Sequence, residues 1–245
     1  MQNFGSAAER TCSPRSMKVR MLTANEDCLR REICRIGNML HQHGLVAACD
    51  GNISVRLRQD LVLCTPTSVS KGMMEPEDLV LVNLSGEQVG GERRPSTELG
   101  MHLLFYRLRP DIRAVVHAHP PTATGFAAAE IALDEPLVAE VVVTCGSIPL
   151  ARYGSPGTPE LAAALEPLVP QHDAILMARH GVVTCGHDLL SAYMKMETVE
   201  HYAKIVLVAR QLGGTTAMPR EEVRRLMKAR ENYEANRLRA VPELD

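Results

Sequence analysis

The fold of this chain can be worked out from the stretch Val115-Val116-His117-Ala118-His119-Pro120. Two valines lead into two histidines separated by one alanine, and a proline follows. On a β-strand this spacing points both imidazoles to one face, because side chains alternate between faces. The proline marks the end of the strand. Two rings on one face can bind one metal ion; the alternative is a strand with two incidental histidines, one of them hydrogen-bonded in the core.

The composition is that of an ordinary globular protein. The chain has 245 residues, of which 45% are hydrophobic and 23% are charged, and this length fits one α/β domain. A net charge of −2 provides no basic field for nucleic acid or an anionic membrane. Aromatic residues make up only 3% of the chain and Trp is absent, which argues against stacking platforms for bases. No apolar run is long enough to span a bilayer.

The cysteines and the N-terminus bear on compartment and domain organisation. The chain has 7 cysteines and no CxxC pair. An odd number of cysteines, several of them in apolar runs, indicates reduced thiols and a cytoplasmic protein. Residues 1–22 lack an apolar signal core and are rich in Gly, Ser and Pro, which predicts a disordered tail. Residues 23–245 are predicted to form a single domain.

Hydrophobic periodicity and turn residues predict alternating helices and strands. The predicted helices cover residues 25–43 (with Asn25 as N-cap), 97–108, 122–132, 191–212 and 219–239, and a further helix begins at residue 159. The predicted strands cover residues 53–57, 61–64, 79–82, 115–119, 138–144, 174–177 and 181–184.

Several polar residues stand out against this background. Glu98 follows Ser96 and Thr97 at a helix start, where it either serves the helix dipole or faces a cleft. Glu140 is the one carboxylate in the apolar segment 138–144, so it lies on an open face or has a function, because burying it alone is costly. His180 stands beside a glycine that allows another group to approach closely.

Two loops have the composition of a neutral anion cradle. The loop Thr65-Pro66-Thr67-Ser68-Val69-Ser70-Lys71-Gly72 is dense in hydroxyl groups, which together with backbone amides can bind a phosphate. The turn at Gly51-Asn52 offers exposed backbone amides and a side-chain amide. Taken alone, each loop is more simply interpreted as a turn.

Taken together and in this order, the motifs resemble the class II aldolase/adducin family, whose best-known enzyme is L-fuculose-phosphate aldolase. The motifs that carry the resemblance are Gly51-Asn52-Ile53-Ser54, Thr65-Pro66-Thr67-Ser68, Pro95-Ser96-Thr97-Glu98, His117-Ala118-His119 and His180-Gly181-Val182. Each motif alone is a weak signal, whereas all of them in order are a strong one.

The resemblance implies a fold and a site. The fold is an α/β, three-layer αβα domain with a largely antiparallel central sheet, commonly assembled as a homotetramer with active sites between subunits. The metal, zinc, is bound by His117, His119 and His180, and Glu98 lies at the metal as a catalytic acid/base. The phosphate-binding positions implied by the family motifs are Gly51, Asn52, Thr67, Ser68, Ser96 and Thr97.

The implied reaction is that of a lyase of carbohydrate metabolism. It cleaves a (deoxy)ketose 1-phosphate to dihydroxyacetone phosphate and an aldehyde, through an enediolate that the metal stabilises as a Lewis acid. Three neutral imidazoles leave coordination positions open for substrate, and Glu98 can move a proton on or off carbon. Zinc suits the imidazoles, but Mn²⁺, Co²⁺ or Fe²⁺ could serve.

The chain departs from the family pattern in two places. Ser68 stands where the family loop usually has glycine. L-fuculose-phosphate aldolase uses a tyrosine from a neighbouring subunit as proton donor, whereas this chain has Val138-Ala139-Glu140 in that region, so Glu140 is predicted to take a second acid/base role. The segment 140–151 is more similar to members that act on 5-deoxypentulose 1-phosphates, such as 5-deoxyribulose 1-phosphate.

Other activities of the same fold stay open. A metal-dependent decarboxylase of a 3-oxo or aromatic acid would need a cation for the carboxylate, from Lys71, Arg152 or Arg179. For Lys71 and Arg152 a solvated surface charge is the simpler interpretation. A sugar-phosphate dehydratase or epimerase is a further alternative. A non-catalytic, adducin-like interaction module is also conceivable, but the three histidines and Glu98 argue against it.

Overall fold

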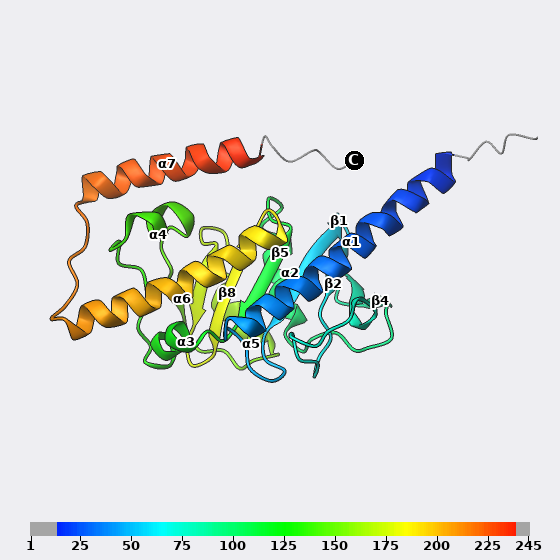
Figure 1. Cartoon of the computed structure of the whole chain (residues 1–245), viewed down its shortest axis with the longest axis horizontal. Helices are drawn as coiled ribbons and strands as arrows, with labels where there is room; N and C mark the ends of the chain where they lie inside the picture. Colours follow the sequence, from blue (N-terminus) through cyan, green and yellow to red (C-terminus); the bar gives the residue numbers. More distant parts are fainter. Residues whose placement is uncertain (1–13, 239–245) are drawn as a thin grey trace, which may run out of the picture.

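An eight-stranded sheet runs through the described part of the chain, which in this computed structural model is residues 14–238, with side chains for residues 25–232 (Figure 1). The strand order is β4-β3-β2-β1-β5-β8-β7-β6. Neighbouring strands are antiparallel except for β6 and β7, which are parallel. The strands are β1 (Asn52–Arg58), β2 (Leu61–Cys64), β3 (Val80–Asn83), β4 (Gln88–Gly90), β5 (Ala114–Ala118), β6 (Leu150–Ala151), β7 (Ala174–Met177) and β8 (Gly181–Gly186).

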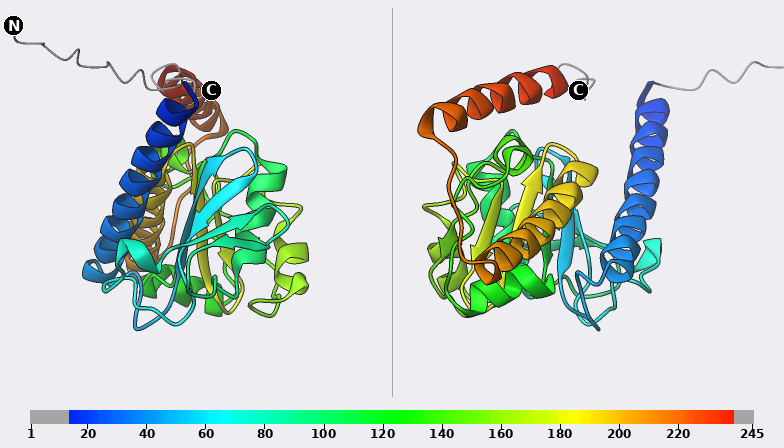
Figure 2. Two further views of the ribbon diagram at one scale, coloured as in Figure 1. Left: turned by 90° about the vertical axis from the view of Figure 1, so that its right-hand side faces the viewer. Right: turned by 60° about the vertical axis from the view of Figure 1, so that its left-hand side comes forward.

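Helices cover both faces of this sheet, as the left view of Figure 2 shows. One buried apolar cluster joins one face of the sheet to α1 (Pro14–Gln42), α3 (Pro121–Ala128), α4 (Ala139–Thr144) and α6 (Leu189–Gln211). A second cluster joins the other face to α2 (Leu99–Leu108) and α5 (Pro159–Leu165). A short 3₁₀ helix, η1 (Pro76–Asp78), follows β2, and α7 (Arg220–Leu238) packs on α4. The predicted three-layer αβα fold with a largely antiparallel sheet is confirmed.

The alternation of strand side chains decides which groups face α2. On β5, Val116 belongs to the cluster under α1 and α6, whereas Val115 belongs to the cluster under α2. His117 lies two residues after Val115 and therefore points to the α2 side. On β1, Ile53 faces α1, so its neighbours Asn52 and Ser54 also face α2. The sheet therefore presents a polar row to α2 beside an otherwise apolar layer.

The first helix begins earlier than the sequence predicted. It begins at Pro14 and not at Asn25, so residues 14–22 of the predicted disordered tail are helical, while residues 1–13 lie outside the described part of the chain. Proline is well suited to the first helical position, and neither Gly nor Pro follows it before Gly37. Asn25 resembled an N-cap, but a single Asn inside such a run costs a helix little.

The predicted strand over residues 138–144 is wrong, because most of this segment forms the helix α4. Its valines favour a strand by local propensity. On a strand, however, Glu140 would share a face with Val142. The helix instead buries Val141, Val142 and Cys145 on one side and leaves Glu140 exposed. Avoiding the burial of a lone carboxylate outweighs the β-propensity of the valines.

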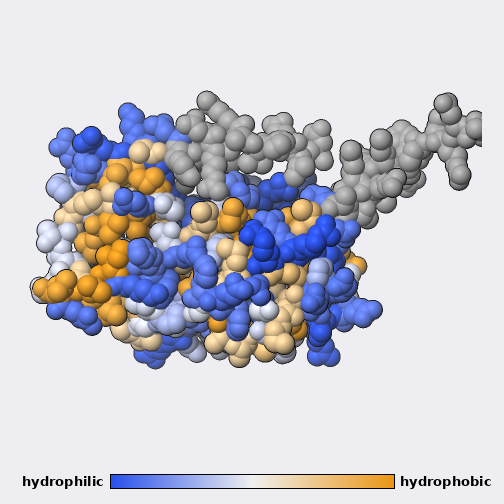
Figure 3. All heavy atoms as spheres, viewed as in Figure 1, coloured by the Kyte–Doolittle hydropathy of each residue, from blue (hydrophilic) through white to orange (hydrophobic). Residues whose placement is uncertain are grey.

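The other predicted helices and strands occur close to their expected bounds, and the short strands β4 and β6 were not predicted. Figure 3 shows apolar side chains gathered over the C-terminal end of α6 and the neighbouring α4, at the left of the view. Leu207, Val208 and Leu212 are exposed at that end of α6. None of the helices in the described residues combines the length and the apolar character that crossing a membrane requires.

Candidate active site

Three histidines from two strand ends converge at one edge of the α2 layer. His117 lies near the end of β5, His119 follows directly after it, and His180 immediately precedes β8. The ring centroids are 4.8 Å apart for His117 and His119, 4.7 Å for His117 and His180, and 5.2 Å for His119 and His180. One nitrogen from each ring lies within 4.8 Å of the others. The sequence-predicted set is therefore brought together.

Strand pairing and one glycine explain why His180 reaches the other two. β5 and β8 pair antiparallel, with Ala118 opposite Val182, so the end of β5 lies beside the start of β8. A Cβ on Gly181 would lie 2.6 Å from His119 Cδ2 and 2.7 Å from the Ala118 carbonyl oxygen. Such distances are too short for any side chain, and the predicted close approach beside Gly181 is confirmed.

Glu98, just before α2, places its carboxylate against the histidines. Its Oε2 lies 3.3 Å from His117 Nε2 and its Oε1 lies 3.0 Å from His180 Nε2. Oε2 accepts a hydrogen bond of 2.8 Å from Asn52 Nδ2. Oε1 is buried and has no hydrogen-bond partner among the described residues. Burial acts to raise the pKa of Glu98, but His117 and His180 outweigh it and hold the pKa well below its usual range.

Contacts at the far nitrogens orient two of the rings. His117 Nδ1 donates to the Val182 carbonyl oxygen at 2.8 Å, and His119 Nδ1 lies 3.2 Å from Asp50 Oδ2. The Nε2 atoms of His117 and His119 therefore face each other, 3.0 Å apart. Burial, and then the neighbouring rings of His117 and His180, lower the pKa of His119 to about 4. Neutral imidazoles oriented through their other nitrogen are typical metal ligands.

These residues fit a divalent metal ion. Ligand nitrogens on one zinc ion lie about 2.0–2.1 Å from the metal, so they must cluster within a few ångströms of each other. The three rings meet this requirement with little adjustment. The buried Oε1 of Glu98, which lacks a hydrogen bond, is a further oxygen donor beside them. Three imidazoles with one carboxylate suit zinc and also the other first-row divalent ions.

The loops predicted to bind phosphate lie side by side. Pro66 and Pro95 form an antiparallel bridge, and the amides of Thr67 and Ser96 donate to carbonyls of the opposite loop at 3.0 and 3.2 Å. Thr67, Ser68, Ser96 and Thr97 are therefore neighbours, and Ser68 and Thr97 are exposed. Ser68 has φ +59°, the left-handed conformation that suits the glycine usual at this family position.

The Gly51-Asn52 turn is less exposed than the sequence predicted. Both residues are buried, not exposed. The side chain of Asn52 hydrogen-bonds Glu98 and His102, so it serves the carboxylate directly. Gly51 has φ +71°, and a Cβ there would lie 2.7 Å from the His117 carbonyl oxygen, so glycine is needed for the chain to pass β5.

The three residues predicted as cations for a carboxylate substrate differ in their exposure and their partners. Lys71 is only 1% exposed, so its interpretation as a surface charge is wrong. Its Nζ donates to the carbonyl oxygens of Val69 at 2.6 Å and Cys49 at 3.1 Å, and burial lowers its pKa. Arg152 is exposed, as expected, and Arg179 pairs with Glu130 at 2.7 Å.

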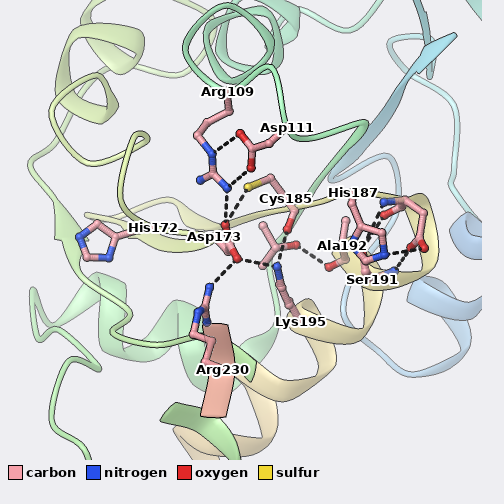
Figure 4. Close-up of polar contacts among 12 residues, drawn as sticks. Arg109, Asp111, His172, Asp173, Cys185, His187, Ser191, Ala192, Lys195 and Arg230 are labelled. Atoms are coloured by element: carbon pink, nitrogen blue, oxygen red, sulfur yellow. Dashed lines mark hydrogen bonds and ion pairs between the residues drawn. The ribbon is translucent and has the colours of Figure 1, made fainter. Parts of the chain in front are cut away.

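Glu140 is not brought to the histidines in this chain. It lies in the first turn of α4 and lines a cavity of about 960 Å³ together with Asp173 and Lys195. Figure 4 shows the polar cluster of this cavity, in which Arg109, Lys195 and Arg230 all contact the carboxylate of Asp173. A second acid/base role for Glu140 is therefore not supported within one subunit.

Sequence reasoning did not assign a role to His102, Ser54 or Tyr106, which continue the polar contacts behind Glu98. A signal was available. Glu98, His102 and Tyr106 recur every four residues, a spacing that places them on one face of a helix. Ser54 lies two residues after Asn52 on β1 and shares its face.

Comparisons with known proteins agree with the motifs. Residues 31–207 match the family described as Class II Aldolase and Adducin N-terminal domain. The chain is 36% identical over 207 residues to 5-deoxy-D-ribulose 1-phosphate aldolase of Bacillus thuringiensis serovar kurstaki, covering 83% of this chain and 96% of that protein. It is 36% identical over 188 residues to 3-oxo-tetronate 4-phosphate decarboxylase of Escherichia coli O6:H1, covering 75% and 88%. A solved structure of L-fuculose 1-phosphate aldolase matches with a TM-score of 0.78 and 32% identity, covering 82% and 95%.

Proposed function

Because the chain belongs to the class II aldolase and adducin family, we propose that it is a metal-dependent lyase that cleaves a ketose 1-phosphate to dihydroxyacetone phosphate and an aldehyde. The observation that carries this proposal is the convergence of His117, His119 and His180 beside the buried Oε1 of Glu98. The relatives of the chain include a 5-deoxy-D-ribulose 1-phosphate aldolase and a 3-oxo-tetronate 4-phosphate decarboxylase.

In this proposal each side chain has a distinct task. The three imidazoles hold a divalent cation, preferentially zinc, which when bound supplies Lewis-acid stabilisation of negative charge on the substrate oxygens. Glu98 Oε2 is held by Asn52, whereas Oε1 has no hydrogen bond and is the oxygen that takes or returns a proton at the substrate carbon. Asp50 and the Val182 carbonyl oxygen keep the rings of His119 and His117 in their metal-binding orientation.

The paired loops provide the phosphate end of the proposed site. Hydroxyl groups of Thr67, Ser68, Ser96 and Thr97 lie on two loops that the Pro66–Pro95 bridge holds together. Hydroxyl and amide donors at such a loop pair bind a phosphate without a positive side chain at its surface. The buried ammonium of Lys71, between the carbonyls of Val69 and Cys49, adds positive charge beneath the loop.

A second candidate activity is decarboxylation of a phosphorylated 3-oxo acid. The similarity to 3-oxo-tetronate 4-phosphate decarboxylase of Escherichia coli O6:H1 favours it. Both reactions place negative charge on an oxygen next to the reacting carbon, so the same cation and phosphate loops can serve either one. They differ in which bond breaks and therefore in their products.

A product screen tests the proposal. Metal-loaded protein is incubated with a panel of ketose 1-phosphates, including 5-deoxyribulose 1-phosphate and fuculose 1-phosphate, and with phosphorylated 3-oxo acids. Dihydroxyacetone phosphate is the expected product, carbon dioxide would establish the decarboxylase instead, and neither product from the whole panel would refute both.

Two glutamate variants assign the acid/base role. Glu98→Gln keeps the size of the side chain but removes its basicity, so we expect bound metal and a loss of turnover of about 100-fold or more. Undiminished turnover would remove Glu98 from the reaction. Glu140→Gln is measured in parallel, and unchanged turnover in that variant would exclude Glu140 from the second acid/base role.

We also propose that the protein assembles as a homo-oligomer, with a tetramer as the expected form. The exposed apolar side chains at the end of α6 support a contact between subunits (Figure 3). Light scattering of the purified protein measures the mass of the assembly, and a monomeric mass across the working concentration range would contradict this expectation.

A further inference from the structure

A continuous chain of hydrogen bonds runs from Glu98 into the layer between the sheet and α2. Asn52 Nδ2 donates to Glu98 Oε2 at 2.8 Å, and Asn52 Oδ1 lies 2.5 Å from His102 Nε2. On the other side of the ring, His102 Nδ1 lies 2.6 Å from Ser54 Oγ, which in turn lies 2.8 Å from the Tyr106 hydroxyl. We call these four residues behind Glu98 the buried hydrogen-bond chain.

Every member of this chain is out of reach of solvent. The exposed fractions are 4% for Asn52, 0% for Ser54, 1% for His102 and 2% for Tyr106. A buried polar group without a hydrogen-bond partner costs about 1–3 kcal/mol, so each donor in the chain has to meet an acceptor within it. The donor and the acceptor of each hydrogen bond can therefore be assigned.

The amide of Asn52 decides the direction. A carboxylate can only accept, so the NH₂ group of Asn52 must face Glu98 and its carbonyl oxygen must face His102. His102 Nε2 must then carry the proton that Asn52 Oδ1 accepts. Burial, with a further contribution from His117, lowers the pKa of His102 to about 3, which agrees with a neutral ring.

The remaining links follow from that assignment. In a neutral ring protonated at Nε2, the nitrogen Nδ1 can only accept, so the Ser54 hydroxyl donates to it. The Ser54 oxygen is then the acceptor for the hydroxyl of Tyr106. All hydrogen bonds point the same way, from Tyr106 toward Glu98, and chains of this kind strengthen their members cooperatively.

We propose that His102 is a positioning residue for Glu98: as a neutral ring protonated at Nε2, it holds the Asn52 amide so that Asn52 binds Glu98 Oε2 beside His117 and Oε1 is directed to His180. The His102 ring is hydrogen-bonded to Asn52 and Ser54 and not to Glu98, so the hydrogen-bonded link from the ring to Glu98 runs through Asn52. This inference deepens the proposed function and rests on its metal centre. Comparable outer contacts to metal ligands change metal affinity by about 10–100-fold.

A matched pair of variants tests the proposal. His102→Gln places an amide nitrogen close to the position of Nε2 and keeps a donor for Asn52. His102→Asn places its amide near Nδ1 and loses that donor. Both variants put an uncharged amide in the same buried site, and they differ by one methylene in the reach of that amide.

The readout is the affinity for Zn²⁺, measured by competition with a chelator, together with the visible spectrum of the Co²⁺-loaded protein. We expect His102→Asn to lose about 10-fold or more in affinity and to show an altered cobalt spectrum, and His102→Gln to stay within a few-fold of the unmodified protein. Equal effects in both variants, or none in either, would overturn the proposal.

An NMR measurement on the metal-free protein tests the tautomer of His102 without depending on turnover. In protein labelled with ¹⁵N-histidine, the resonances of His102 are identified by their absence in His102→Gln. A proton on Nε2 and none on Nδ1 is expected at pH 7, and any other protonation pattern contradicts the assignment. If no substrate of the panel is cleaved, the proposed function fails, but the tautomer and the metal affinity still decide the role of His102.

Discussion

At the scale of single residues, Gly181 leaves no room for a side chain beside the histidine cluster. A Cβ there would lie 2.6 Å from His119 Cδ2 and 2.7 Å from the Ala118 carbonyl oxygen. We expect Gly181→Ala to destabilise the protein by about 1–3 kcal/mol through overpacking and to weaken metal binding at least tenfold, measured by thermal unfolding and chelator competition.

Gly125 provides the matched control for this substitution. It lies in α3, and nothing lies within 4 Å of a Cβ at that position. Gly125→Ala should therefore leave metal binding unchanged and raise stability by about 0.5–1 kcal/mol, the usual gain from removing a glycine inside a helix. Equal losses of metal affinity in both alanine variants would show that Gly181 is not specifically required.

Ser68 is a residue whose backbone is strained by its position. Its φ of +59° is left-handed, where a Cβ costs about 1–2 kcal/mol. Ser68→Gly relieves that strain but raises the conformational entropy of the unfolded chain. We therefore expect the free energy of unfolding to change by less than about 1 kcal/mol. Ser68→Val adds a branched side chain at the same φ and should destabilise the protein clearly more in urea unfolding. A more stable Val variant would contradict this account of the loop.

At the scale of elements, α4 provides the sharpest difference between local propensity and the observed structure. On the helix, Val141 is 5% exposed, whereas Val143 is only partly buried. On a strand the two valines would share one face and be equally buried. The helix predicts that Val141→Ala costs about 1.5–3 kcal/mol of lost burial.

The companion variant Val143→Ala should be neutral or slightly stabilising, because alanine is the better helix former by up to about 0.7 kcal/mol. Chemical unfolding of both variants measures the difference in the free energy of unfolding. Similar costs for the two substitutions would favour the strand that the sequence predicted.

At the scale of the whole molecule, Asp173 connects elements that are distant in sequence (Figure 4). Its carboxylate accepts hydrogen bonds from Arg109 at 2.9 Å, from Lys195 at 2.7 Å and from Arg230 at 2.7 Å. The last of these ties α7 to the sheet. Asp173 is 6% exposed, so Asp173→Asn removes the buried negative charge that Arg109, Lys195 and Arg230 share. We expect a loss of about 3–5 kcal/mol in stability.

Asp111→Asn is the control for this substitution. The Asp111 side chain is 52% exposed and pairs with the same Arg109, so its loss should cost no more than about 1 kcal/mol. Equal losses of stability in the two variants would show that burial of Asp173 does not increase its contribution to stability.

The Asp173 cluster also predicts a pH dependence. Burial acts to raise the pKa of Asp173, but Lys195, Arg230 and Arg109 outweigh it and hold the pKa below its usual range. A depressed folded-state pKa contributes stability that is fully present above the unfolded-state pKa of about 4. That stability is lost as the pH falls from there through the folded-state pKa. Thermal unfolding between pH 5 and pH 2 should show the upper part of this loss, and Asp173→Asn should remove part of the slope.

The sequence by itself determined the family, the layered α/β fold and the residues of the histidine cluster. His-Ala-His on a strand specifies two rings on one face, because the period of side chains in a strand is local geometry. Alternation located β1, short apolar runs located β2, β7 and β8, and Gly181 stood out as the glycine beside His180. These features depend only on neighbours in the chain, which the sequence displays directly.

Only the tertiary structure decided the remaining features. Burial of Lys71, the helical state of residues 139–144 and the hydrogen bonds of Asn52 with Glu98 and His102 depend on residues far away in sequence. Whether a charge or an amide is buried, and with which partner, is set by the packing of whole layers. The sequence contained the spacing of Glu98, His102 and Tyr106, but only the packing of α2 on β1 decided which hydrogen-bond partners these side chains have.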